Sequence, residues 1–187
     1  MRRAGAADLP AVADTLAAAF DGEPWTRHVV DARDHRARLR DLYAFYAELS
    51  LDLGELWISE DAAAVAAWLP SARFPDVAAR LAEEAPRLRA LAGGRVVAWE
   101  AAERIANAHA LEEPHWFLAS VGVRPERQGQ GLGTAVLAPV LDVLDVPAAL
   151  ETSTPGNVGF YARLGFAVRA EAAVPGGPRV WFLVRRP

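Results

Sequence analysis

The most informative stretch of this sequence is Val123-Arg124-Pro125-Glu126-Arg127-Gln128-Gly129-Gln130-Gly131-Leu132-Gly133-Thr134. It follows an apolar run, residues 116–123, of the kind that forms a central strand covered on both faces. Three glycines without side chains let backbone N–H groups approach an anion where the next helix exposes its unpaired N-terminal donors. The stretch predicts a strand-to-helix turn suited to a pyrophosphate, and a glycine-rich turn without a ligand fits it about equally well.

Two familiar phosphate loops do not match this stretch. The dinucleotide fingerprint needs a third glycine where Thr134 stands, and the P-loop needs a lysine. The chain contains no lysine at all, because all 20 of its basic residues are arginine. These residues exclude both nucleotide loops and any Schiff-base mechanism.

The sequence after the turn predicts alternating elements. We expect a helix over about 134–144, a strand over 148–152, a helix over 157–164, and a final hairpin that turns at 175–178. Strand, turn, helix and strand in this order indicate an α/β fold.

The first half of the chain predicts mainly helices around one hairpin. Asp8 is the expected N-cap of a first helix that Pro24 ends, and a second amphipathic helix runs through 39–49 with aromatic residues that favour core packing over substrate contact. Residues 56–69 predict a β-hairpin, and residues 74–111 two or three helices broken at Pro86 and at Gly93-Gly94.

Composition limits the function. A chain of 187 residues fits one domain, residues 1–187, and without cysteine it has no disulfide, thiolate metal site or cysteine nucleophile. A net charge of −4 argues against general nucleic-acid binding. No apolar run reaches the roughly 18 residues of a membrane span, and no signal core follows Met1, so we expect a cytoplasmic protein.

Two motifs in order resemble the GNAT superfamily of N-acetyltransferases. The first is Gln128-x-x-Gly131-x-Gly133, and the second comprises Leu150-Glu151-Thr152, Asn157, Phe160-Tyr161 and Leu164-Gly165-Phe166. The resemblance covers residues 116–166. It implies a single α/β domain with a mixed, twisted sheet and helices on both faces. It also implies direct transfer of an acetyl group from acetyl-CoA to the primary amine of a small molecule, in a ternary complex and without a metal.

The resemblance also assigns cofactor-binding residues. The backbone of Val121 and Val123 is expected to pair with the pantetheine arm. The pyrophosphate is expected at the turn that contains Gln128, Gly129, Gln130, Gly131, Gly133 and Thr134. Asn157 is expected either to contact the cofactor or to act as an ordinary helix N-cap.

Two residues are the catalytic candidates. By its family position, Tyr161 would protonate the departing thiolate, whereas the residues alone favour a core aromatic. Glu151 is the candidate base for the amine, at about equal odds with a surface carboxylate. His115 and His28 stay in reserve, because a lone histidine more often packs or caps than catalyses.

The resemblance extends to the subgroup that acetylates puromycin, and with it implies antibiotic resistance. The matching segments include residues 16–20, 26–28 and 177–179. Glu23 and Trp25 depart from the pattern near the expected acceptor pocket and favour an aromatic or cationic amine, since a carboxylate attracts ammonium and an indole stacks. The rival hypotheses are acetylation of protein amines and a non-catalytic acyl-CoA-binding module.

Overall fold

The computed structural model, which describes residues 1–187, contains one seven-stranded mixed sheet. The strand order is β1-β2-β3-β4-β5-β7-β6, and only the central β4–β5 pair is parallel. The strands are β1 (Arg2–Arg3), β2 (Glu55–Ile58), β3 (Ala64–Pro70), β4 (Trp116–Val123), β5 (Ala148–Thr152), β6 (Ala167–Ala173) and β7 (Arg179–Arg185). The predicted hairpins, central strand and single α/β architecture are confirmed.

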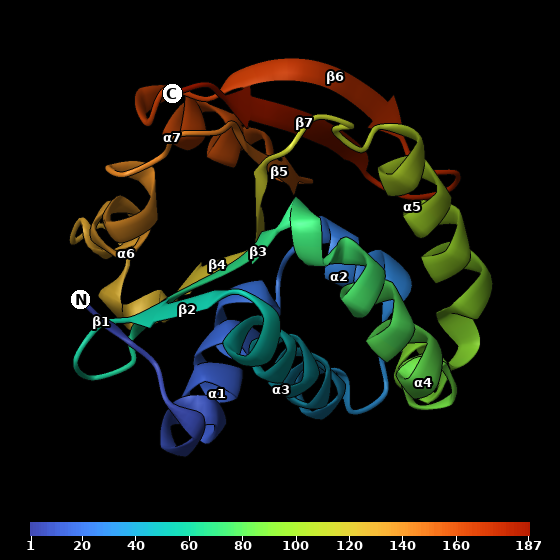
Figure 1. The fold of residues 1–187 in the computed structure, drawn as a ribbon. Helices are drawn as coiled ribbons and strands as arrows, with labels where there is room; N and C mark the ends of the chain where they lie inside the picture. Colours follow the sequence, from blue (N-terminus) through green and yellow to red (C-terminus); the bar gives the residue numbers. More distant parts are fainter.

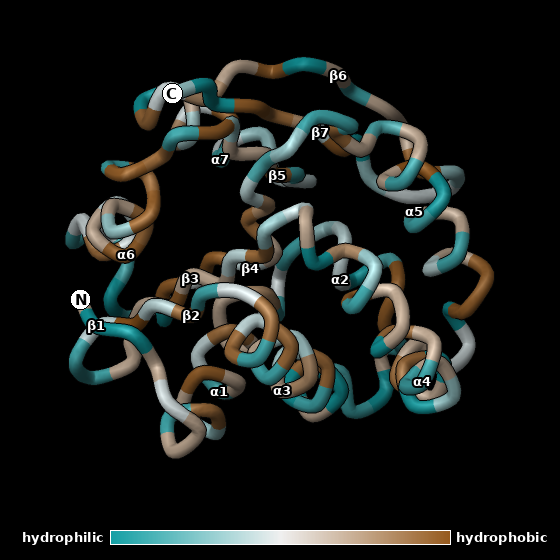
Figure 2. Tube along the Cα trace, viewed as in Figure 1, coloured by the Kyte–Doolittle hydropathy of each residue, from teal (hydrophilic) through white to brown (hydrophobic).

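Helices cover both faces of this sheet (Figure 1). On one face lie α1 (Leu9–Phe20) and α3 (His35–Leu53), and on the other lie α6 (Leu132–Leu141) and α7 (Pro155–Arg163). Hydrophobic segments of the tube gather between these layers (Figure 2). Because β3 is apolar along its length and packs against both layers, its residues 64–69 are fully buried, as expected for a strand that helices cover on both faces.

The two helices that follow β3 and precede β4 in the chain form a separate wall of the molecule, on the right of Figure 1. It consists of α4 (Phe74–Ala92) and α5 (Val96–Ala108), which pack on α3 and on the short helix α2 (Pro24–Val29). The predicted break at Gly93-Gly94 is confirmed. The predicted break at Pro86 is wrong, because α4 continues through this residue.

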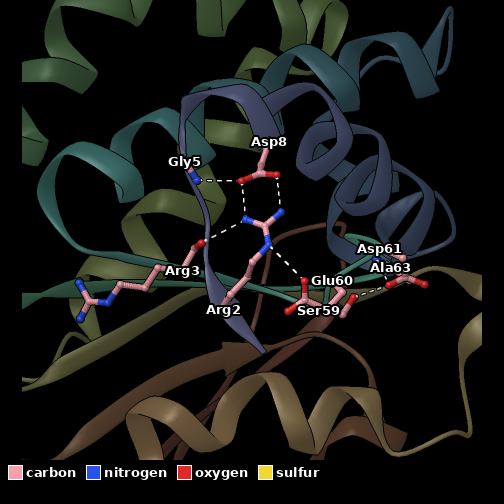
Figure 3. A network of polar contacts seen from close by, with 8 residues as sticks. All are labelled: Arg2, Arg3, Gly5, Asp8, Ser59, Glu60, Asp61 and Ala63. Carbon is pink, nitrogen blue, oxygen red and sulfur yellow. Dashed lines mark hydrogen bonds and ion pairs between the residues drawn. The ribbon is translucent and has the colours of Figure 1, made fainter.

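The helix ends correct two further predictions. Pro24 begins α2 instead of ending α1, consistent with the fixed φ that suits proline to a first helical turn. Asp8 lies at the N-cap position of α1, but its side chain makes no capping bond. The Asp8 carboxylate instead accepts two hydrogen bonds from Arg2, at 2.7 and 2.8 Å, and one from the Gly5 amide (Figure 3). This pairing ties the start of the chain to the first helix.

Short 3₁₀ turns precede several of these helices. They span Ala6–Asp8, Ser71–Arg73, Gly93–Arg95 and Pro125–Arg127. The helix predicted over 134–144 runs from Leu132 to Leu141. No helix in the protein combines the length and apolarity that crossing a bilayer requires, and no three acidic or imidazole side chains gather as a metal site.

Gly54, at the C-cap of α3, is the position where a single methyl group should cost the most stability. A Cβ there would lie 1.9 Å from the Trp68 backbone oxygen, so Gly54→Ala forces α3 and β3 apart. We expect about 3 kcal/mol of destabilisation and a Tm lower by about 6–12 °C. In the control Gly22→Ala the added methyl meets no atom within 4 Å, so thermal denaturation should show almost no shift. Equal Tm values for the two variants would contradict the packing.

Candidate active site

The two parallel central strands separate soon after they pair. β4 and β5 are in register only at Trp116–Ala148 and Phe117–Ala149. Just beyond, the pairing of β4 with β3 skips Ala119, a bulge that bends the strand. A cavity of about 1110 Å³ lies at this opening and is lined by residues from both sheet faces. Pockets for one small ligand hold roughly 300–1,000 Å³, so this one lies just above that range.

The edge of β4 that faces the opening carries free backbone groups. Opposite residues of an antiparallel pair alternate between bonded and non-bonded positions. The Arg124 amide donates to the Ala63 carbonyl at 2.9 Å, which makes Val123 and Val121 the non-bonded positions toward β3. Their N–H and C=O groups therefore point toward the opening. Both N–H groups and the Val121 C=O are available to an extended, amide-containing ligand, whereas the Val123 C=O accepts the Gln128 side-chain amide.

The glycine-rich turn presents unpaired donors at the same opening. The N–H groups from Gly129 to Thr134 donate to no carbonyl or side chain of the protein. Gly129 and Gly131 have φ values of 74° and 77°, which glycine adopts without strain, and a Cβ on either would meet nothing within 4 Å. Gly131 is the N-cap of α6, so the helix dipole adds to the attraction for an anion.

The side chains of this turn mostly contact the protein. The Gln128 amide donates to the Val123 carbonyl at 3.1 Å and so fixes the turn against the strand end. Arg127 pairs with Asp61 at 2.5 Å and donates to the Gln130 side chain at 3.1 Å. Gln130 is not among the residues that line the cavity, although its neighbours are. The groups that this turn offers to an anion are therefore mainly backbone N–H groups.

Tyr161 combines core packing with a free hydroxyl. Its ring packs edge-on against Phe160 and Phe166, with centroids 5.1 and 5.8 Å away, and the residue is 6% exposed. The hydroxyl makes no hydrogen bond within the protein, and the residue lines the cavity. Burial, together with the nearby Glu23 carboxylate, raises the pKa of Tyr161 above its ordinary value. The phenol is therefore protonated at neutral pH.

Glu151 lies on β5 and projects to the opposite face of the sheet from Leu150, which packs beside Tyr161. Its side chain is half-buried and lines the cavity. Burial raises the pKa of Glu151 to about 7. A carboxyl group that loses its proton near neutrality is suited to accept a proton from an ammonium group.

The sequence matches the model of the Acetyltransferase (GNAT) family over residues 39–166, which is more than half of the chain. The chain belongs to the GNAT acetyltransferase family. It is therefore an acetyl-CoA-dependent enzyme, and the free amides of β4 and of the glycine-rich turn fit an amide-containing arm and a pyrophosphate. The members of this family are acetyltransferases, so acetyl-CoA is the co-substrate.

Solved structures share this fold. A structure described as histone acetyltransferase HPA2 and related acetyltransferase, from Corynebacterium glutamicum, has a TM-score of 0.75 at 22% identity, with 100% of this chain and 94% of that chain covered. The polyamine N-acetyltransferase of Drosophila melanogaster gives 0.59 at 16% identity, over 100% and 98% of the two chains. Arylalkylamine N-acetyltransferase 2 of Aedes aegypti has a TM-score of 0.60 at 13% identity, with 99% of this chain and 97% of that chain covered.

Glu23 and Trp25 line the cavity of this GNAT acetyltransferase on the side of α2. The Glu23 carboxylate accepts a hydrogen bond from the Thr154 hydroxyl at 2.5 Å, and the Trp25 amide donates to the Ser153 hydroxyl at 3.1 Å. These bonds join α2 to the loop after β5. They place a carboxylate and an indole beside the opening.

The two reserve histidines and Asn157 lie in different environments. His115 lines the cavity, and its Nδ1 lies 2.7 Å from the Glu113 carbonyl, which leaves Nε2 as the acceptor. His28 packs beneath Gly177 with a buried, unpartnered Nε2 and is not a lining residue. Asn157 is not the N-cap of α7, because Thr154 takes that position. The Asn157 side-chain amide donates to the Thr152 hydroxyl at 3.2 Å.

Sequence reasoning missed part of the acceptor side of the cavity. Tyr43 and Tyr46 of α3 line it, whereas the aromatic residues of this helix were expected mainly to pack in the core. Trp99 and Glu103 of α5 line it as well. Their spacing of four residues, one helical turn, is a signal for a shared face, but nothing local says which cavity that face meets.

Proposed function

We propose that this enzyme acetylates the primary amine of a small cationic or aromatic molecule. The observation that supports this proposal is the set of three cavity-lining carboxylates, Glu23, Glu103 and Glu151. None of them takes part in any ion pair of the protein. Carboxylates without a basic partner favour a positively charged ligand. Trp25 and Trp99 supply aromatic faces for it.

In the proposed mechanism the backbone binds acetyl-CoA and two side chains move protons. The backbone amides at Val121, Val123 and the glycine-rich turn hold the pantetheine arm and the pyrophosphate of acetyl-CoA. Glu151 accepts the ammonium proton, which frees the nitrogen lone pair for attack on the thioester carbonyl carbon. As the carbon–sulfur bond breaks, Tyr161 donates its phenolic proton to the departing sulfur, and the second proton that the nitrogen loses restores the phenol. Free strand amides also stabilise the negative charge that develops on the carbonyl oxygen.

Neighbouring structures support a small amine acceptor. Those similar to this chain include proteins described as polyamine and arylalkylamine N-acetyltransferases. A ribosomal-protein alanine N-acetyltransferase of Escherichia coli has a similar fold as well, at a TM-score of 0.51 and 16% identity, over 99% of this chain and 91% of that chain. Here α2, α4 and α5 contribute to the acceptor side of the cavity, whereas a peptide needs an open groove. This wall favours a small molecule over a protein amine.

A screen of amines against acetyl-CoA, with release of free thiol as the readout, tests the proposal. The panel includes puromycin, arylalkylamines and aliphatic amines. The resemblance over residues 16–20, 26–28 and 177–179 supports a puromycin-like acceptor and an antibiotic-resistance role, and acetylation of puromycin would support both. Absence of thiol release with every amine would contradict the proposal and favour a binding module.

Glu23→Gln should raise the KM for a cationic acceptor about tenfold and change kcat little. The amide still accepts the Thr154 hydrogen bond but no longer attracts an ammonium group, and a bond to a charged group is worth about 1.5–3 kcal/mol. Steady-state kinetics measure the effect. Glu48→Gln, which removes the same charge from an exposed position on α3, is the matched control. Unchanged KM values for all active amines would remove Glu23 from the acceptor site.

A further inference from the structure

Glu103 is an exposed carboxylate at the cavity wall, oriented by one hydrogen bond. It lies on α5, and its Oε1 accepts the indole N–H of Trp99, one turn earlier, at 2.7 Å. None of the arginines that line the same cavity pairs with Glu103: Arg127 pairs with Asp61, Arg169 donates to the His109 carbonyl, and Arg163 forms no ion pair. The mechanism above does not use Glu103.

Tyr46 of α3 lines the same cavity as Glu103 and Glu151. Burial raises the pKa of Tyr46 above its ordinary value, and the negative charges of Glu103 and Glu151 raise it further. Glu103 on α5 and Glu151 on β5 reach this cavity from different elements.

Side chains suited to an amine line this region. Tyr43 is 5% exposed and lines the cavity, and its hydroxyl oxygen is not fully enclosed by protein, so it can hydrogen-bond a ligand or water there. Beside Glu103, the rings of Trp25 and Trp99 lie 5.8 Å apart at 58°, and indole faces attract cations.

We propose that Glu103, supported by Trp99, forms a second cation subsite and that the preferred acceptors are diamines, with the reacting amine at Glu151 and a distal ammonium or guanidinium group at Glu103. The inference rests on the proposed function and narrows its substrate class. Glu103 then determines specificity and takes no part in the chemistry. It binds a second positive charge, which a simple aromatic or aliphatic monoamine lacks.

Paired substrates that differ only at the distal group test the subsite. Linear diamines of three to six carbons are compared with the monoamines in which a methyl group replaces one ammonium, such as 1,5-diaminopentane with hexylamine. The wild type should prefer the best diamine by about 10–100-fold in kcat/KM, as expected for one hydrogen-bonded charge pair. Glu103→Gln, whose amide oxygen can still accept the Trp99 bond, should abolish that preference and leave the monoamine within about twofold.

Glu100→Gln is the matched control, because Glu100 lies on the same helix, outside the cavity, and pairs with Arg89. It should keep the wild-type preference. If the wild type acetylates monoamines and diamines equally, or if Glu103→Gln keeps the diamine preference, the subsite is wrong while the proposed function stands. If no amine of either kind releases thiol, the proposed function fails and the subsite fails with it.

Discussion

Replacing Glu151 by Gln should lower kcat for every amine acceptor by about 100-fold or more, and should leave the affinity for acetyl-CoA within about twofold. General acid–base catalysis contributes typically 10²–10⁴-fold, and the amide cannot accept the ammonium proton. The glycine-rich turn and the β4 amides, where acetyl-CoA is expected to bind, do not include Glu151. Initial rates of thiol release measure kcat, and calorimetry with acetyl-CoA measures the affinity.

The pH dependence gives a second signature of Glu151. Only the carboxylate form accepts a proton, and burial raises its pKa to about 7, so kcat of the wild type should rise with pH with its midpoint at about 7 and then level off. In Glu151→Gln this limb should disappear, and only the ionisation of the free amine should still affect kcat/KM. Profiles of kcat from pH 5.5 to 9 distinguish the two.

Glu171→Gln on β6, which removes an exposed carboxylate paired with Arg179, is the control and should behave as the wild type. A Glu151→Gln enzyme that keeps more than a third of the wild-type kcat would show that another base acts. His115 would then be the next candidate, because it lines the same cavity with Nε2 free.

The cofactor side could be predicted from sequence because its signals are local. The glycines of the turn indicate its left-handed conformations, and Gly129 and Gly131 adopt them. The apolar run 116–123 predicts a buried strand, and β4 spans these residues. Each of these features depends on residues adjacent in the chain, so one sequence is enough to find them.

The acceptor side depends on long-range packing and could not be predicted in the same way. Glu103 meets the cavity only because α5 packs on α2, and Tyr46 only because α3 lies under the same opening. Asp8 has the sequence position of an N-cap, but the Arg2 guanidinium, from the preceding strand β1, binds its carboxylate instead. The raised pKa of Glu151 likewise arises from burial by the folded protein.

Tyr161→Phe should lower kcat by about 10–100-fold, with the KM for acetyl-CoA and the Tm unchanged. The phenol hydroxyl has no hydrogen-bond partner in the protein, so its removal leaves no buried group unsatisfied and keeps the ring contacts with Phe160 and Phe166. What is lost is a proton donor for the departing sulfur: burial and Glu23 keep the phenol protonated, so it can donate across the working pH range. Stopped-time thiol assays and thermal denaturation test both halves of this expectation.

Tyr161→Leu separates catalysis from packing. It removes the ring as well as the hydroxyl from a buried position, so it should lose kcat to a similar extent and also about 2–4 kcal/mol of stability. If Tyr161→Phe keeps at least half of the wild-type kcat while Tyr161→Leu unfolds at lower temperature, Tyr161 is a packing residue and the sulfur takes its proton from solvent. If both variants lose turnover but only the leucine variant loses stability, the hydroxyl is the group that acts.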